Sequence, residues 1–435
     1  MLADSQESPA KNPGQLGPAL IGLSSNGLKS ARLLADPISS GPGLFTLHRR
    51  AAGEGLALLV AQAAWGGDAT QAARAAYGEI SRVLQDQGLT IVHERLFGSL
   101  KVKAAVMSAR DAAFRASKLP ADGPYTYIQG QPPWGEGFAG AIIQAVSCRN
   151  PQDEVWTVMH QGKPAGKGWR RQDTTFLLLQ NIQGLVIGPQ EVNTRPLQTK
   201  RLIRRAADIL QSQGASYRDV VRTWFYLADI LDWYPEFNRA RTAIYGQFGL
   251  LPGQDNGHLG LPASTGISGK VHTGAACAMD VLAAVGPKAS RPPVKQLSNP
   301  GQQDAFQYGS AFSRGALLRQ SDVTLIQVSG TAAIDEKGAS LYHDDVRAQI
   351  DCTFDKIAAL IGQEGAALTD IAAACVFVKR PKDALAYQER AAARGLQNLP
   401  AIIIVADICR EELLFEIDAE VALNPYSPGF RRVHE

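Results

Sequence analysis

The sequence lacks the features of several common classes of protein. No apolar run approaches the roughly 20 residues that a helix needs to span a bilayer. The N-terminal sequence MLADSQESPAKNPGQ has no basic segment followed by an apolar one, as a secretory signal has. The cysteines are odd in number, far apart and without CxxC spacing: Cys148, Cys277, Cys352, Cys375 and Cys409. We therefore expect a cytoplasmic protein with reduced thiols and no membrane partner.

An excess of positive charge is also missing. The chain has 44 Lys and Arg residues against 41 Asp and Glu residues, a formal net charge of +3 over 435 residues. A nucleic-acid binder needs concentrated positive charge to displace counterions. The densest basic segment, 200–205, lies in a helical pattern, which favours a solvated helix face. The sequence thus gives no reason to expect a nucleic-acid partner.

Motifs for metals and common cofactors are absent. The seven histidines are scattered, with no HxH or HExxH spacing, so we predict no metal. GxGxxG, GxxxxGK[ST] and GxSxG are missing, which removes support for a nucleotide cofactor or a serine-hydrolase elbow. We expect a protein that works without a cofactor.

What the sequence does contain is a repeat. Three segments share one order of predicted elements: strand, helix, strand, helix and closing strands. In the clearest copy these elements are 325–332, 345–361, 371–378, 381–392, 401–408 and 413–423. The second copy places them at 175–183, 197–210, 220–227, 234–248 and 274–285. The first copy is fainter and begins with its first helix at 71–84, followed by a strand at 95–102, a helix at 109–117 and strands at 125–129 and 138–146. We predict an α+β protein of three tandem modules.

The stretches between the copies suggest where the modules end. Segment 150–171 is rich in Gly, Pro and charge, and segment 287–302 is Pro-rich without periodicity, so both are predicted to be loops. We therefore expect modules at 1–149, 150–290 and 291–435, the first being degenerate with a flexible N-terminus.

Three segments of the third copy carry a family resemblance: SGTA at 329–332, VFVKRPKD at 376–383 and DICREELLFEIDAEVAL at 407–423. They resemble a Rid domain, also called YjgF or L-PSP. The resemblance implies chorismate-mutase-like units that trimerise, with ligand clefts between neighbouring units. Three copies in one chain would form an intramolecular pseudo-trimer with sheets inside and helices outside. We mildly favour a monomer over a homo-oligomer.

A narrower resemblance covers about 155–423 and is to the chorismatases, Rid-related enzymes that hydrolyse chorismate to pyruvate and a cyclic acid. The similar segments are RTWFY at 222–226, FNRAR at 237–241, LPASTGI at 261–267, LSNP at 297–300, FSR at 312–314 and the closing segment at 409–418. Two positions depart from that branch. Phe225 stands where chorismatases usually have Asn, and an insert is shortened to 307–309.

Glu416 is the leading catalytic candidate. In the predicted strand FEID, Glu416 and Asp418 share one face and Phe415 and Ile417 the other. By resemblance, Glu416 matches the glutamate that Rid deaminases and chorismatases use as an acid or base. Enol ethers and enamines are activated by protonation of their terminal carbon, and a desolvated carboxyl can supply that proton near neutral pH. The alternative is a solvated strand acid.

The other two copies have no glutamate in their closing strands, which read AMDV at 278–281 and AGAI at 139–142. We therefore expect one working cleft in each chain.

The substrate's carboxylate needs a guanidinium, because its planar fork binds carboxylates with two hydrogen bonds. Candidates are Arg222, Arg239 and Arg314. Arg222 lies in an apolar strand, so it either contacts ligand or forms a structural ion pair. Arg239 is a ligand contact or a helix-surface residue. Tyr226 is a candidate pocket residue, and Thr265 and Gly266 either bind an anionic ligand or form a turn.

Three functions remain open. The first is a chorismatase-like hydrolase that releases pyruvate from the enol ether of a small carboxylated metabolite. The second is an enamine or imine deaminase that releases ammonia. Rid deaminases carry an Arg at the start of the penultimate strand, and Ile402 at that position argues against an imine substrate. The third is a protein that binds a metabolite without catalysis.

Overall fold

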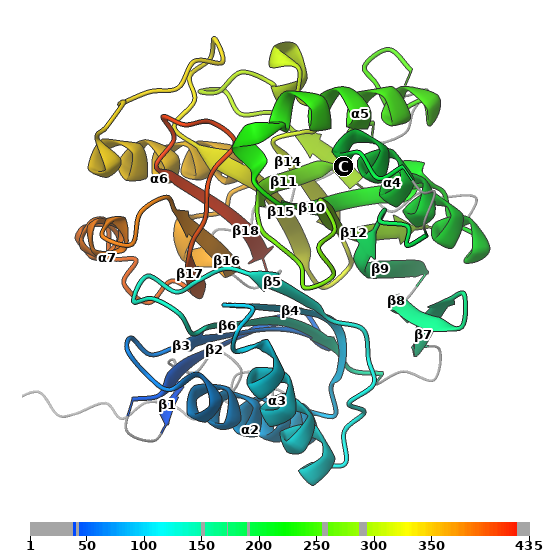
Figure 1. The fold of residues 1–435 in the computed structure, drawn as a ribbon, viewed down its shortest axis with the longest axis vertical. Coiled ribbons are helices and arrows are strands. Elements are labelled where there is room, and N and C mark those ends of the chain that lie inside the picture. Colours follow the sequence, from blue (N-terminus) through cyan, green and yellow to red (C-terminus); the bar gives the residue numbers. More distant parts are fainter. Residues whose placement is uncertain are drawn as a thin grey trace, which may run out of the picture.

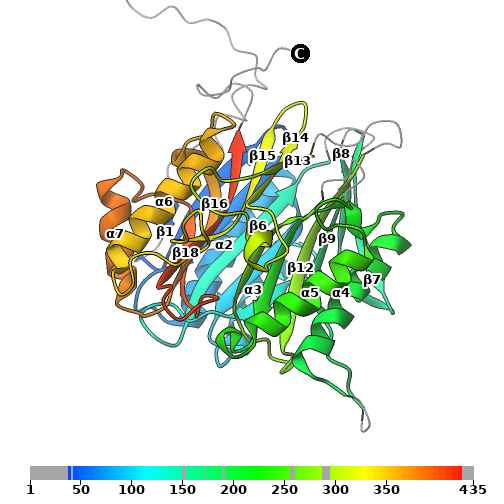
Figure 2. The same cartoon turned by 90° about the horizontal axis from the view of Figure 1, so that it is seen from above.

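The computed structural model describes residues 38–40, 43–148, 153–171, 173–188, 192–254, 260–286 and 294–423. Three six-stranded sheets face one another around a common centre, and pairs of helices cover their outer faces (Figure 1). Figure 2 gives the same arrangement from above, with α6 and α7 on one side and α4 and α5 on the other. Most of the N-terminal segment predicted to be flexible, 1–37, lies outside the described residues.

The three sheets have the same topology. In chain order within each module, the strands are arranged 1-2-3-6-4-5 across the sheet. The fourth and fifth strands are parallel, as βαβ units require, and the other neighbours are antiparallel. This shared order confirms an α+β fold of tandem modules in a pseudo-trimer.

The strands and helices of each module are as follows. The first module has β1 (Ile38–Ser40), β2 (Phe45–Ala52), β3 (Leu56–Ala63), α2 (Ala69–Gln87), β4 (Thr90–Gly98), α3 (Lys103–Ala116), β5 (Thr126–Gln129) and β6 (Phe138–Val146). The second has β7 (Glu154–His160), β8 (Lys163–Arg171), β9 (Thr174–Gln183), α4 (Arg195–Ser212), β10 (Val220–Leu227), α5 (Tyr234–Gln247), β11 (Ala263–Ser268) and β12 (Cys277–Val285). The third has β13 (Val294–Leu297), β14 (Gly315–Arg319), β15 (Thr324–Ala332), α6 (Val346–Gly362), β16 (Ile371–Val378), α7 (Asp383–Ala393), β17 (Ala401–Val405) and β18 (Phe415–Leu423).

Helix α6 illustrates why these segments fold as they do. The Asp345 side chain accepts a hydrogen bond from the Ala348 backbone N–H and caps the first turn. Ile350, Phe354 and Ile357, spaced at the helical period, are fully buried against the outer face of the third sheet. The capped end and the single apolar stripe together fix the position and the orientation of the helix.

The inner faces of the three sheets build a core that all modules share. Leu58, Trp224 and Phe377, one from each module, lie in the same buried cluster. The outer faces pack separately against their own helices. Because strand side chains alternate between the two faces, each strand contributes to the shared core and to its own module.

Most of the predicted helices and strands are confirmed within a few residues, but the interpretation of 150–171 as a loop is wrong. Strands β7 and β8 form a hairpin there, turned at Gln161 and Gly162, which have positive φ angles of 49° and 74°. Much of β7 is solvent-exposed, so its sequence carries no clear apolar alternation. The segment 287–302 likewise contains β13, and β2, β3 and β14 were not predicted.

None of the helices in the described ranges is long and apolar enough to cross a membrane.

Candidate active site

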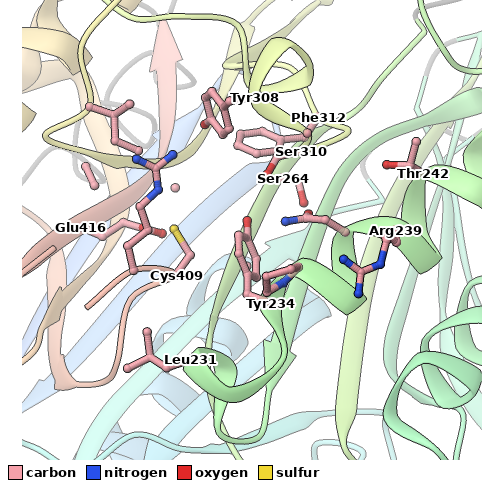
Figure 3. Close-up of a pocket in the computed structure, with 18 of the residues that line it drawn as sticks. Leu231, Tyr234, Arg239, Thr242, Ser264, Tyr308, Ser310, Phe312, Cys409 and Glu416 are labelled. Carbon is pink, nitrogen blue, oxygen red and sulfur yellow. The ribbon is translucent and has the colours of Figure 1, made fainter. Parts of the chain in front are cut away.

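A cavity of about 1060 Å³ lies at the boundary between the second and third modules. Helix α5 and strand β11 form one wall. Strands β15 and β18, with the segments 308–314 and 409–412, form the other wall. Figure 3 shows Glu416 and Cys409 on one side of this space and Tyr234 and Arg239 on the other. The cavity therefore brings together parts of the chain that lie far apart in sequence.

Glu416 lies in this cavity with its side chain almost buried. It pairs with Phe377 of β16 and Ala332 of β15, and only 4% of its surface is exposed. No hydrogen bond to its carboxyl is found within the described residues. Burial, together with the Asp418 carboxylate, raises the pKa of Glu416 to about 8 against the opposing effect of Arg222 and Arg314. A carboxyl with this pKa carries its proton at neutral pH.

The backbone opposite Glu416 is shaped to receive it. A Cβ at Gly330 would overlap Oε1 of Glu416 and lie 3.3 Å from Cγ2 of Thr265. Glycine therefore leaves the space that the carboxyl occupies.

A buried polar layer lies beneath the cavity. Thr265 donates its hydroxyl hydrogen to Oδ2 of Asp418 at 2.8 Å, and Arg222 donates to Oδ2 of Asp418 at 3.3 Å and to the hydroxyl of Thr265 at 2.6 Å. The Arg222 guanidinium also lies 4.9 Å from the ring centroid of Trp224. All four side chains are at most 2% exposed. This layer joins the second module to the third through hydrogen bonds that are shielded from solvent.

Three of the predicted ligand contacts belong to this interior and not to the cavity wall. Arg222 forms the structural ion pair that was one of its two predicted roles, because Asp418 compensates its buried charge. Thr265 uses its hydroxyl for Asp418 and lies within β11, not in a turn before a strand. Tyr226 is 2% exposed and packs in the shared core, with its ring centroid 6.3 Å from that of Phe97.

The other predicted contacts do line the cavity. Gly266 follows Thr265 on β11. Arg239, on α5, is largely exposed and forms a 2.9 Å ion pair with Glu236. Arg314 is buried and donates from Nε to the Gln303 carbonyl at 3.0 Å and from Nη2 to the Tyr308 hydroxyl at 2.7 Å. No hydrogen bond from its Nη1 to a described residue is found, and Arg314 lines the cavity.

Several cavity residues were not predicted from the sequence. Tyr308 lies between two guanidiniums, with Arg314 5.4 Å and Arg410 5.3 Å from its ring centroid. Phe312 lines the same wall, and Tyr234 faces it from α5 (Figure 3). Tyr308 ends a short 3-10 helix, 305–308, and Phe312 follows it in a stretch without apolar periodicity, so only their aromatic character beside FSR could have indicated a role.

Cys409 also lines the cavity. Burial, with a smaller contribution from Glu416, raises the pKa of its thiol to about 12. A thiol with this pKa stays protonated at neutral pH, as expected for a residue that packs rather than attacks.

The position of Ile402 corrects one step of the sequence interpretation. Strand β17 lies at the edge of its sheet that faces the first module, and Ile402 packs there close to Gly140. Ile402 therefore does not lie beside Glu416. The residue at the corresponding strand position that does approach Glu416 is Thr265 of the second module. Thr265 is not an arginine either, so this strand position supplies no guanidinium beside Glu416.

Within the ranges that the structure describes, no group of three His, Cys, Asp or Glu residues could hold a metal ion. The cavity's polar lining instead consists of carboxyl, guanidinium and hydroxyl groups.

Known proteins resemble this chain in sequence and in structure. The family described as Endoribonuclease L-PSP matches 307–423, which is most of the third module. A chorismatase from Streptomyces hygroscopicus is 26% identical over 313 residues, covering 65% of this chain and 84% of the relative. A chorismatase from Streptomyces rapamycinicus is 28% identical over 240 residues, covering 49% of this chain and 67% of the relative. A crystal structure of a chorismatase superposes with a TM-score of 0.56 at 20% identity, covering 76% of this chain and 93% of the other.

The fold, the repeat and these matches support a relationship to the Rid superfamily in a tandem form. Within that superfamily, the chain has a chorismatase-like relationship. Both curated relatives are named as enzymes, which supports the prediction that this chain is also an enzyme.

Proposed function

We propose that this cavity hydrolyses the enol ether of a small carboxylated metabolite, with Glu416 as the general acid and pyruvate as one product. The observation that carries the proposal is a nearly buried carboxyl in a large cavity, held protonated near pH 7. The relatives named chorismatase supply the first substrate to test, since chorismate carries an enolpyruvyl ether.

The proposed reaction is CH₂=C(OR)COO⁻ + H₂O → CH₃COCOO⁻ + ROH. Glu416 gives its proton to the terminal CH₂, and a C–H bond forms as the C=C π bond is lost. Water adds to the resulting oxocarbenium carbon and returns a proton to Glu416. The hemiketal then loses ROH, and its C–O bond breaks as the ketone of pyruvate forms. Glu416 ends as it began.

The other cavity groups fit the parts of such a substrate. Arg314, whose Nη2 donates a hydrogen bond to the Tyr308 hydroxyl, can bind a carboxylate through its Nη1. The rings of Tyr234 and Phe312 give the cavity apolar surface for a cyclic skeleton. Ser264 on the β11 wall and Ser310 on the opposite wall add hydroxyl groups.

The proposal is tested by following pyruvate with lactate dehydrogenase after chorismate is added to the wild type and to Glu416→Gln. We expect pyruvate from the wild type and loss of about 10²–10⁴ in rate from the variant, with ligand affinity retained. The matched control is Glu389→Gln, which changes an exposed glutamate on α7 that pairs with Arg347.

Ammonia from an enamine or imine substrate without pyruvate from an enol ether would favour the deaminase instead. A ligand that binds but is not turned over by the wild type would favour the binding protein.

A further inference from the structure

A threonine–aspartate pair occurs at two of the three boundaries between modules. Thr126 of β5 donates to Oδ1 of Asp280 in the second module at 2.6 Å. Thr265 of β11 donates to Oδ2 of Asp418 in the third module at 2.8 Å. The two pairs are equivalent by strand register. Each threonine occupies the same place on a fifth strand, and each aspartate the same place on a closing strand.

The third boundary has the same register but no polar pair. Ile402 takes the place of the threonine and Ile142 that of the aspartate, and both lie in the shared apolar core. The threonine–aspartate pair is therefore not needed to hold a boundary together.

The two polar boundaries differ in what lies two residues before the aspartate. Before Asp418 this residue is Glu416, on the same face of β18. Before Asp280 it is Ala278. Asp280 receives a second bond from the Asn181 backbone N–H at 2.7 Å and lies 3.0 Å from His93. Asp418 instead receives the Arg222 guanidinium, so its charge is fixed close to Glu416.

We propose that Asp418, held across the module boundary by Thr265 and Arg222, is a positioning residue that keeps the carboxyl of Glu416 protonated in the cavity. The Thr265 hydroxyl holds the Asp418 carboxylate by a hydrogen bond. The Thr265 methyl group lies next to the space that the missing side chain of Gly330 leaves for the Glu416 carboxyl. Thr265 and Arg222 of the second module thereby act on the acid of the third module without lining the cavity themselves.

The charges around Glu416 make Asp418 the group that favours the neutral form. Arg222 on β10 and Arg314, on the same cavity wall as Glu416, both favour the ionised form. Asp418 raises the pKa of Glu416, and burial acts in the same direction. The Cys409 thiol also faces the carboxyl but remains neutral. Without Asp418, burial would be left to oppose the effect of the two guanidiniums on Glu416.

The test is a direct titration of Glu416 that needs no substrate. Protein labelled with ¹³C at the glutamate carboxyl is titrated by NMR, and Glu416 is assigned as the signal that Glu416→Gln removes. In Asp418→Asn we expect the midpoint to fall by about one pH unit or more. The matched control, Asp280→Asn, removes the equivalent carboxylate, and its Glu416 midpoint should stay within about 0.3 unit because Ala278 stands where the acid would be.

Three results would overturn the proposal: an unchanged Glu416 midpoint in Asp418→Asn, an equal fall in both variants, or a rise. If Asp418→Asn does not fold, Thr265→Val decides the question. It keeps the Asp418 charge but removes the bond that holds it, so the midpoint should fall by a smaller amount, while Thr126→Val should leave it unchanged. A midpoint in Thr265→Val equal to that of the wild type would then reject the proposal.

A second readout rests on the proposed function. With an enol-ether substrate, the pH at which kcat falls on the alkaline side should be lower in Asp418→Asn than in the wild type, with little change in KM. If the wild type does not turn over the enol ether, the proposed function is rejected but the titration result still stands. The two proposals therefore fail separately.

Discussion

Gly330 faces the carboxyl of Glu416 so closely that a methyl group at position 330 would overlap Oε1. The Gly330→Ala variant should therefore displace the acid from its place in the cavity. Its φ angle is not in the left-handed region, so the backbone itself tolerates alanine. We expect a loss of about 10²-fold in kcat, the usual cost of moving a catalytic group by about 1 Å.

The control for this variant is Gly78→Ala on α2, where an added Cβ meets nothing within 4 Å. It should keep full activity and gain roughly 0.5–1 kcal/mol in stability from its helical position. Full activity in Gly330→Ala would show that the position of Glu416 is not critical.

The pH dependence of the rate follows from the protonation of Glu416. The acid must carry its proton, and its pKa is raised to about 8 by burial and by Asp418. We expect kcat to be constant through neutral pH and to fall tenfold per unit well above pH 8. A pH–rate profile between pH 6 and pH 10 measures this directly. A rate that rises through pH 8 would instead identify Glu416 as a base.

The same group makes the stability of the fold depend on pH. The pKa of Glu416 is raised from 4.5 to about 8, so the native state holds a proton that the unfolded chain releases. Between these values, the free energy of unfolding falls as pH rises. Glu416→Gln mimics the neutral acid, so it should match the wild type at pH 5 and exceed it at pH 9 by on the order of 2–4 kcal/mol.

Denaturant unfolding at both pH values measures that difference. Equal stability of Glu416→Gln and the wild type at pH 9 would contradict the raised pKa.

Arg171 joins all three modules at one point. It donates to the Glu54 carbonyl at 2.6 Å and to Gln320 at 3.4 Å, and it pairs with Asp322. We expect Arg171→Met to lower the free energy of unfolding by about 2–3 kcal/mol, because it leaves a partly buried carboxylate without its partner.

The neighbouring Arg170 supplies the control, since its 4.0 Å contact with Glu154 is exposed. Arg170→Met should cost less than about 0.5 kcal/mol in a urea melt. Equal effects of the two variants would mean that the three-module junction adds no stability.

The repeat made the fold predictable, because helices such as α6 and buried strands such as β16 carry strong apolar patterns. Strands β7 and β8 escaped prediction because β7 is only partly buried and β8, with the sequence KPAGKGWRR, has few apolar residues to form such a pattern. Glu416 was found through its motif, and its place in the cavity agrees with the prediction, while its role is still a proposal.

Which other residues line the cavity depends on which modules lie against each other, and the order of residues in the sequence does not show that directly. Arg222 and Thr265 lie near Glu416 but point into the layer below the cavity. Tyr308 and Arg410 meet only because two loops of the third module fold against each other. A correct list of residue types therefore did not distinguish the wall of the cavity from its support.

The covalent linkage of the modules allows something that a homotrimer cannot do. In a trimer of identical subunits, one substitution changes all three boundaries at once. Here the three equivalent positions have diverged to Thr126, Thr265 and Ile402, each with its own partner. One boundary can therefore carry the groups of an active site while another only holds two modules together. The backbone of the three modules stays symmetric, and the side chains at their boundaries do not.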